Sequence, residues 1–554
     1  MEQHEHDAVA ALATPRRVFK RVSRACRRCR RLRTKCANQD GVPPCDPCRQ
    51  IGAECSFPSR GEPDADRAFR QGPRHRTTTV TPPPSSLRTT PSPPRANTPG
   101  WESLPPYEEV IEGVQCLTTS FFQLGFLPKL LFFESLRTNP ESANFFLLFS
   151  VLSVSARFTP SLVARYQGGS NATQVFLGQA SCFVMEQMFV SSLESIQGFF
   201  LMSIAEWGRG DKNRSLVYMG IAIRLAGIMH LHREETYRIP ESATNEDIVY
   251  SEVARRTFWM LETFENLQSD TDSPVSFSYS DITVLLPCSE NEFVFGIKPA
   301  QRAALMGTPP AKADPGLAYL ASRSLFATLL QTHSLWGQVA RIASADAMQI
   351  AASQSAASTQ VTSTDYDQLS RRLLEFEQHL PPSHAWSVWN LRAHKLSGLD
   401  LAFLSAAMIL RLSNIILRRS YLHCLLQAHA DSTDPSHIAV QLYTNMLTLH
   451  SQIAAFFEFR SPDQGYPALI VFCAYVCGTL ANHLHRQPQH CPAVAPQALA
   501  ILKSSMRGLE KLQGAWPFAQ RWCRALKKMT EDLLTVPERG DQRATAASPV
   551  AIQV

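Results

Sequence analysis

Residues 26–55 read CRRCRRLRTKCANQDGVPPCDPCRQIGAEC and hold six of the fourteen cysteines in this chain of 554 residues. The six form two copies of the spacing Cys-x2-Cys-x6-Cys, which place them at Cys26, Cys29, Cys36, Cys45, Cys48 and Cys55. Zinc in structural sites takes four ligands in a tetrahedron, so one zinc ion would leave two cysteines without a role. If two thiolates bridge two metal ions, six thiolates close both tetrahedra. The count therefore favours a binuclear zinc cluster.

Disulfides, a catalytic zinc and a one-zinc ribbon are the alternative roles for these cysteines. The chain opens with MEQHEHDAVAALATPRR, whose apolar stretch is too short for a secretory signal, so we expect an intracellular protein with reduced thiols. A catalytic zinc keeps an open position and usually recruits histidine or a carboxylate, and no histidine lies between the first and sixth cysteines. A ribbon through the two Cys-x2-Cys pairs, fifteen residues apart, remains an alternative that leaves the third and sixth cysteines without a role.

Basic charge is concentrated around the first three cysteines. Residues 16–36 contain eleven Lys and Arg and no Asp or Glu, whereas the whole chain carries only +6, so the remaining residues together carry −5. A local basic segment is typical of nucleic-acid binding or of a nuclear-import signal, and a solvated basic tail is the plain alternative.

With this charge and spacing, residues 21–58 resemble the fungal binuclear zinc cluster domain, the six-cysteine DNA-binding module of a large class of transcription factors. The resemblance rests on the cysteine spacing, the basic first half and the prolines Pro43 and Pro44 before the fourth cysteine. It implies two Zn²⁺ ions bridged by Cys26 and Cys45. The resemblance assigns the other ligands as Cys29 and Cys36 for one ion, and Cys48 and Cys55 for the other.

The resemblance also implies which residues contact DNA. The family typically reads CGG triplets in the major groove through basic residues just before the third cysteine, where Arg or Lys can reach guanine O6 and N7. Arg33 occupies such a position, whereas the neighbouring position, often basic in the family, is Leu32 here. Phosphate contacts, or compensation of the formal −2 charge of the cluster, are expected from Arg27, Arg28, Arg30, Arg31 and Lys35.

Proline, serine and threonine dominate the segment after the cysteines. Ten prolines lie between Pro73 and Pro106, so we expect residues 59–106 to form a semi-rigid or disordered linker. No apolar heptad follows the cysteines, and neither a dimer geometry nor a half-site spacing can be predicted. Residues 1–20 and 536–554 are expected to be disordered tails.

Helical periodicity dominates residues 107–535, with apolar residues three and four apart, so the fold class is mainly α. Ser191-x-x-Glu194 resembles a capping box that opens a helix. The apolar pattern predicts a mostly buried helix at residues 214–231 and a long helix at residues 396–427. An Ala, Ser, Gln and Thr stretch at 344–364 is expected to be a flexible insert.

The longest uncharged apolar stretch, residues 466–482, is predicted to be a buried core helix rather than a membrane span, with Cys473 and Cys477 in the core.

This helical region also resembles a known one, the middle homology region of many fungal zinc-cluster regulators, over roughly residues 115–385. The resemblance is carried, in the family's order, by SIQGFFLMSIAEWGRGD, YMGIAIRLAGIMHLHRE, EVARRTFWMLETFE and SPVSFSYSDITVLLPCSENEF, and LLEFEQHLPPSH is similar to a later element. The family often shows Asp-Arg where this chain has Glu265-Asn266, so no role is transferred to that pair. The region is usually regarded as regulatory, which makes a small-molecule effector a candidate partner.

Catalytic motifs do not support an enzyme. The sequence contains neither G-x-S-x-G nor H-E-x-x-H, and Gly208-Arg209-Gly210 lacks the Lys and Ser/Thr of a phosphate loop. His483, His485, His490 and Cys491 lack a recognised metal-ligand spacing and are interpreted as incidental.

These features predict a nuclear, sequence-specific regulator of RNA polymerase II transcription that reads CGG motifs in double-stranded promoter DNA. From the resemblance we expect a pathway-specific regulator of a fungal secondary-metabolite gene cluster. The alternatives are a regulator of nutrient or carbon metabolism in the same class, a zinc adapter without base preference, and a metabolic enzyme with an accessory zinc module. Expected partners are DNA, the transcription machinery, a second copy of the chain and an effector, but no membrane.

Overall fold

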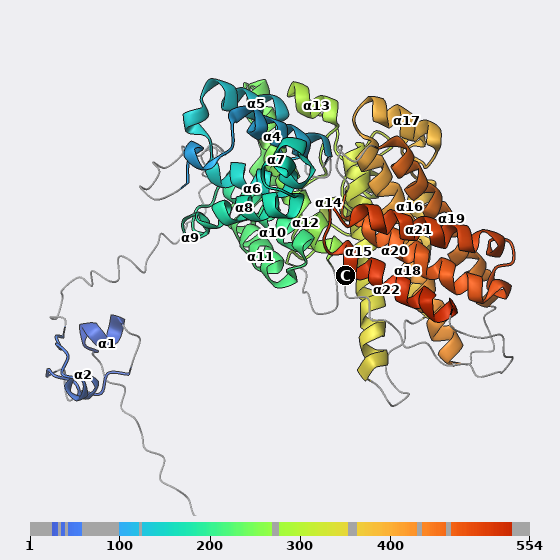
Figure 1. The fold of residues 1–554 in the computed structure, drawn as a ribbon. Helices are drawn as coiled ribbons and strands as arrows, with labels where there is room; N and C mark the ends of the chain where they lie inside the picture. Colours follow the sequence, from blue (N-terminus) through green and yellow to red (C-terminus); the bar gives the residue numbers. More distant parts are fainter. Residues whose placement is uncertain are drawn as a thin grey trace, which may run out of the picture. The chain divides into compact units, whose positions relative to one another are not determined.

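The computed structural model describes residues 25–31, 35–38, 42–57, 99–120, 125–268, 276–352, 363–428, 435–460 and 467–534. Helices make up 73% of it, and these residues include no strand, which confirms the mainly α fold class. The chain divides into two units, residues 1–83 and 84–554 (Figure 1). Both predicted tails and the linker up to residue 98 lie outside the described residues.

Two helices of five residues each, α1 (Arg27–Arg31) and α2 (Asp46–Gln50), form the regular structure described in the first unit. Each begins directly after the first cysteine of a Cys-x2-Cys pair. The second cysteine of each pair therefore lies within its helix. Helix α2 has Pro47 in its first turn and is followed by Gly52 at φ +62°, a left-handed conformation that glycine adopts without strain.

The second unit consists of helices packed on one another. Its first helices are α4 (Tyr107–Ser120), α5 (Lys129–Thr138), α6 (Phe145–Ser155), α7 (Pro160–Arg165), α8 (Gly169–Ser181), α9 (Val184–Gln187), α10 (Leu193–Arg209), α11 (Lys212–Ile228), α12 (Asn245–Leu267), α13 (Glu290–Phe295) and α14 (Pro309–Ala313). Its later helices are α15 (Leu325–Ala352), α16 (Ser363–Gln378), α17 (Val388–Leu396), α18 (Asp400–Ala428), α19 (Pro435–Phe459), α20 (Leu469–Arg486), α21 (Ala498–Leu512) and α22 (Ala519–Leu534). In Figure 1, α4–α11 gather on one side and α16–α22 on the other; α12 packs on α15, and α15 on α18.

The ends of α10 correct one sequence prediction. The N-cap is Ser192, whose hydroxyl accepts a hydrogen bond from the backbone N–H of Ser195 at 3.1 Å, so the predicted box from Ser191 to Glu194 is out of register by one residue. At the other end, Gly210 at φ +94° caps the helix. The Gly-Arg-Gly stretch is therefore a helix terminus.

Helix α11 is less buried than its apolar sequence predicted. Leu216, Val217 and Ile228 are exposed, and the helix buries a narrow face that includes Met219 and Leu225. Because α11 packs chiefly on α10, at the surface of the body, only one side of it is covered.

The predicted core helix and its cysteines are confirmed. Residues 469–482 belong to α20, and Cys473 and Cys477 are fully buried. Among the described helices, only α18 contains a segment long and apolar enough to cross a membrane, Asp400–Leu422. Of this segment, 89% is buried inside the helical body. Helix α18 packs mainly on α15 and α19.

Two boundaries differ from expectation. Helix α15 continues to Ala352, so residues 344–352 are helical, and 353–362 lie outside the described residues. A short 3₁₀ helix, η1 (Trp101–Ser103), precedes residue 107; the Trp101 indole N–H donates to the Pro140 carbonyl at 2.8 Å. The helical body therefore extends into the predicted linker.

A buried charge network joins α12 to distant loops. Arg256 is 0% exposed and ion-pairs with Glu252 at 3.3 Å and with Glu290. Its guanidinium also donates to the carbonyls of Gly125 and Cys288, each at 3.1 Å. One side chain therefore holds the segments before α5 and around the start of α13 against α12.

Neighbouring groups extend this network. Arg255 donates to Glu234 at 2.6 and 2.8 Å, and Glu252 pairs with Arg302 at 2.7 Å. Burial alone would raise the pKa of Glu252, but Arg302, Arg256 and Arg255 hold it below its ordinary value. The RRTFW stretch thus serves as a structural clamp.

Replacing Arg256 with Met should lower the free energy of unfolding of the body by about 3–5 kcal/mol, because Glu252 and Glu290 lose a buried partner. All eight tryptophans lie after residue 100, so tryptophan fluorescence during urea unfolding reports on this unit. The exposed Arg224→Met on α11 is the control, with an expected change within about 0.5 kcal/mol. Equal stability of the two variants would contradict the clamp.

A second prediction concerns Glu262 on α12. Burial raises the pKa of its carboxyl to about 7, assisted by the nearby Glu265 and opposed by a hydrogen bond from the Asn266 amide. A carboxyl pKa raised in the folded state makes stability fall as pH rises from the ordinary value to the raised one. We therefore compare the change in the free energy of unfolding caused by Glu262→Gln at two pH values. This change should be more stabilising at pH 8 than at pH 5 by about 1–3 kcal/mol, as measured by urea unfolding. A pH-independent effect would contradict the raised pKa.

Candidate metal centre and nucleic-acid interface

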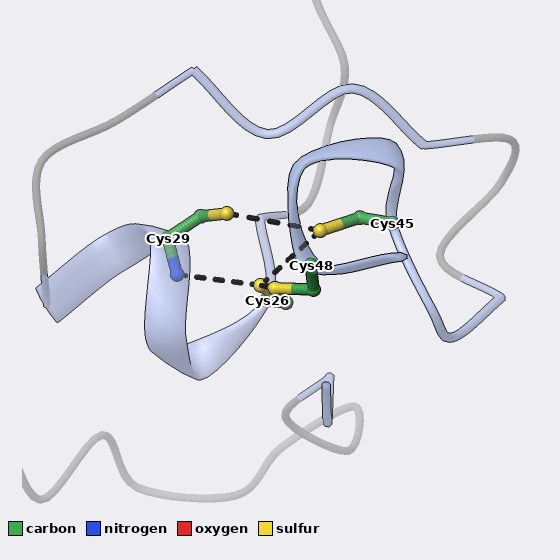
Figure 2. Close-up of side chains that lie close together, drawn as sticks. All are labelled: Cys26, Cys29, Cys45 and Cys48. Carbon is green, nitrogen blue, oxygen red and sulfur yellow. Dashed lines mark hydrogen bonds between the residues drawn. The ribbon is translucent and has the colours of Figure 1, made fainter. Parts of the chain in front are cut away.

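Four buried thiols converge in the first unit. The sulfur atoms of Cys26, Cys29, Cys45 and Cys48 all lie within 4.8 Å of one another (Figure 2). Sulfur–sulfur distances are 3.7 Å between Cys26 and Cys45, 3.8 Å between Cys26 and Cys48, and 3.7 Å between Cys29 and Cys45. Two sulfurs each about 2.3 Å from one tetrahedral zinc are about 3.8 Å apart, whereas a disulfide requires about 2.05 Å. The spacing fits thiolates that share metal ions.

The third cysteine of each copy lies beside the first. The backbone N–H of Cys26 donates to the Cys36 sulfur at 3.4 Å, and that of Cys45 donates to the Cys55 sulfur at 3.3 Å. The two contacts join equivalent residues in the two copies of the cysteine spacing. The two halves of the unit are therefore related by an approximate twofold symmetry. It brings all six cysteines of the repeat to one centre.

Backbone hydrogen bonds cross between the copies. The N–H of Arg27 donates to the Ser56 carbonyl, and the N–H of Asp46 donates to the Ala37 carbonyl, both at 2.9 Å. Each bond joins the first residue of one helix to the residue after the third cysteine of the opposite copy. The two halves therefore hold each other in place.

Ionisation differs among the thiols. Burial disfavours the Cys26 thiolate, but a hydrogen bond from the Cys29 backbone N–H at 3.3 Å and contacts with neighbouring thiols lower its pKa. The pKa of Cys45 is lowered in the same way, against burial, by the Cys48 N–H. Burial raises the pKa of Cys55 to about 12. The first cysteine of each copy is thus the better thiolate, the form that binds metal.

The donor set and the small core both suit structural zinc. Sulfur donors arranged in tetrahedra are typical of closed zinc sites. Buried cysteines themselves form the core of the described part of this unit, with Ala25, Cys55 and Phe57 packed against them. The described residues of this unit include no larger apolar core, and a small unit of that kind depends on metal to fold.

The basic residues have different surroundings. The Arg28 side chain hydrogen-bonds to Cys48 and opposes the rise in the pKa of that thiol caused by burial, whereas Arg27 and Lys35 are exposed. The backbones of Arg30 and Arg31 belong to α1. Arg33, the residue predicted to contact bases, lies outside the described residues.

One polar residue at the centre was missed by sequence reasoning. The Asn38 amide donates to the Cys36 sulfur at 3.3 Å. Its position two residues after a cysteine was the only signal, and an amide in a loop is too common to single out.

Comparison with known proteins agrees with this geometry. Residues 24–62 match the Fungal Zn(2)-Cys(6) binuclear cluster domain, which binds two zinc ions, and residues 118–309 match the Fungal specific transcription factor domain. The chain thus carries two segments that match domains of fungal Zn(2)-Cys(6) transcription factors. Both matched domains are those of transcription regulators.

Curated relatives are distant. The chain is 21% identical over 428 residues to a Zn(2)-C6 fungal-type transcription factor of Fusarium oxysporum f. sp. lycopersici, covering 73% of this chain and 44% of that protein. It is 24% identical over 424 residues to an uncharacterized transcriptional regulatory protein of Schizosaccharomyces pombe, and this match covers 70% of this chain and 59% of that protein. The chain thus spans about half the length of the curated relatives it matches. No solved structure matches it.

The histidines near α20 show no metal geometry. The Tyr443 hydroxyl hydrogen-bonds to His483 Nδ1 at 2.8 Å, and the rings of His483 and His490 stack at 5.2 Å. Within the described residues, the four-cysteine group is the only cluster with metal-binding geometry.

The number of zinc ions per chain distinguishes the binuclear cluster, which holds two, from the ribbon, which holds one. We expect the full-length chain to hold two zinc ions and Cys36→Ser to lose at least one, because Cys36 would be a ligand of the cluster but not of the ribbon. Cys182→Ser, at an exposed cysteine of the helical body, is the control and should keep two. Metal analysis by mass spectrometry is the measurement. Unchanged zinc content in Cys36→Ser would exclude that cysteine as a ligand.

Proposed function

We propose that this regulator acts in the nucleus as a sequence-specific DNA-binding protein that controls RNA polymerase II transcription. The observation that carries the proposal is the group of four buried thiols at zinc-sharing distances, two of which lie in residues 16–36, a segment of charge +11. Zinc fixes the short helices, and the local basic charge attracts the phosphate backbone.

The proposed ligand set is that of the family. Cys26 and Cys45 bridge the two zinc ions, and their mutual distance of 3.7 Å and lowered thiol pKa values support this role. The remaining ligands are Cys29 and Cys36 on one ion, and Cys48 and Cys55 on the other. Cys26–Cys48 and Cys29–Cys45, at 3.8 and 3.7 Å, are pairs that share an ion in this scheme.

DNA contacts follow from the basic residues around α1. Arg33 is proposed to read guanine in CGG triplets, and the exposed Arg27 and Lys35 to contact phosphates together with Arg30 and Arg31. Arg28 instead compensates the charge of the cluster through Cys48. Leu32 in place of a second basic residue suggests one base contact fewer than is common in the family.

The wider role rests on family resemblance. We propose residues 21–58 as the DNA-binding domain and 107–535 as the regulatory domain, in a regulator of a secondary-metabolite gene cluster that works with the transcription machinery as a homodimer. Genome-wide occupancy mapping would identify its promoters and test the pathway assignment.

Base preference provides the decisive test. On a CGG duplex, Arg33→Ala should lose about 1–3 kcal/mol of binding free energy, with little loss on a scrambled duplex. Arg27→Ala should weaken both duplexes alike and reduce the slope of log affinity against log salt by about one. Fluorescence anisotropy with the full-length protein measures both effects. Equal wild-type affinity for the two duplexes would instead support an adapter without base preference.

A further inference from the structure

A cavity of about 970 Å³ opens in the helical body between the end of α4, α5, the start of α12, α13 and the turn from α17 to α18. Figure 1 shows α5, α13 and α17 along the same edge of this body. Pockets for small organic molecules usually measure about 300–1,000 Å³, so the space is sufficient for such a ligand. None of the functions proposed above uses it.

The floor of the cavity is apolar and recessed. Leu117, Leu127 and Phe293 are at most 5% exposed, and they come from three different segments. At the rim, Leu130 and Phe295 are more than 60% exposed. Large apolar side chains exposed around a hollow mark a binding site for an apolar group.

Two cations also line the cavity, and both come from α5. Neither Lys129 nor Arg137 forms an ion pair or a side-chain hydrogen bond with another residue that the structure describes. Desolvation lowers the pKa of the Lys129 amine, an effect that Glu290 partly offsets. Lys129 is exposed at the mouth of the cavity, and an ammonium beside an apolar wall and without a hydrogen-bonded partner gains free energy when an anion binds next to it.

Carboxylates around the cavity limit the charge of that anion. Glu290 is already paired with Arg256, whereas Glu134 and Glu246 lie exposed at the rim. Two rim carboxylates repel a polyanion such as a nucleotide, but they leave room for one negative group near Lys129. Charge and shape together favour a molecule with a single acidic group and an apolar body.

We propose that this cavity binds an amphipathic organic monoanion, whose apolar body lies on the floor and whose acidic group pairs with Lys129. The occupant would contact Glu290, which completes the ion pair of Arg256. Ligand binding is thereby connected to the charge network that holds α12, α5 and α13 together.

A matched pair of probes tests the proposal on full-length, zinc-loaded protein. The first probe, 8-anilinonaphthalene-1-sulfonate, carries one negative charge, and N-phenyl-1-naphthylamine has the same aromatic body without it. Lys129→Met should weaken binding of the sulfonate about tenfold while changing that of the neutral probe less than about twofold. The control is Lys298→Met, which removes the same charge from an exposed residue outside the cavity lining and should change neither affinity.

A cavity-filling variant, Val249→Trp, should weaken both probes, because Val249 lines the floor. If circular dichroism shows that this variant does not fold, the comparison of Lys129→Met with Lys298→Met still tests the proposal. Unchanged sulfonate binding in Lys129→Met, or no saturable sulfonate binding by the wild type, would overturn the proposal. Equal weakening of both probes would also overturn the anion assignment and indicate an apolar docking groove for a protein helix. DNA binding plays no part in these readouts, so their failure leaves the proposed function untouched.

Discussion

Tetrahedral zinc coordination is the constraint on which the N-terminal unit depends, because it sets the distance between every two thiolates that share an ion. The sulfur atoms of Cys26 and Cys45 lie 3.7 Å apart, and each belongs to the residue that directly precedes a short helix. Metal binding therefore fixes the starts of α1 and α2 relative to each other. Helices of five residues are too short to be stable alone, so their orientation is a product of the metal centre.

In the helical body, buried ion pairs likewise hold distant segments of the chain together. Arg256 spans α12, the segment before α5 and the start of α13, and its partners lie up to 131 residues away in the chain. Such a network is stable only when every member is satisfied. The cavity that we propose as a ligand site borders the same network through Glu290, so the structural clamp and the proposed ligand site share a residue.

The cysteine centre could be predicted because metal geometry acts locally and leaves its spacing in the sequence. The mainly α fold and the buried Cys473 and Cys477 followed from apolar periodicity in the same way. The burial of Arg256 could not be predicted, since it depends on partners such as Gly125 and Glu290 that come together only in the folded body. The cavity likewise arises from five separate segments.

The errors have physical causes too. Ser191 and Ser192 are both good N-caps, so composition alone could not choose the register of α10. Helix α11 was predicted to be mostly buried because apolar content does not reveal how many neighbours a helix has. At residues 344–352, the same small polar composition that suggested an insert is compatible with a helix continuing from a packed start.

The crossed backbone bonds, Arg27 to Ser56 and Asp46 to Ala37, have a consequence for truncation. Each bond joins the two copies of the cysteine spacing, so a cut between the copies removes both bonds at once. The shortest fragment that retains both bonds therefore contains both copies, from residue 27 to residue 56.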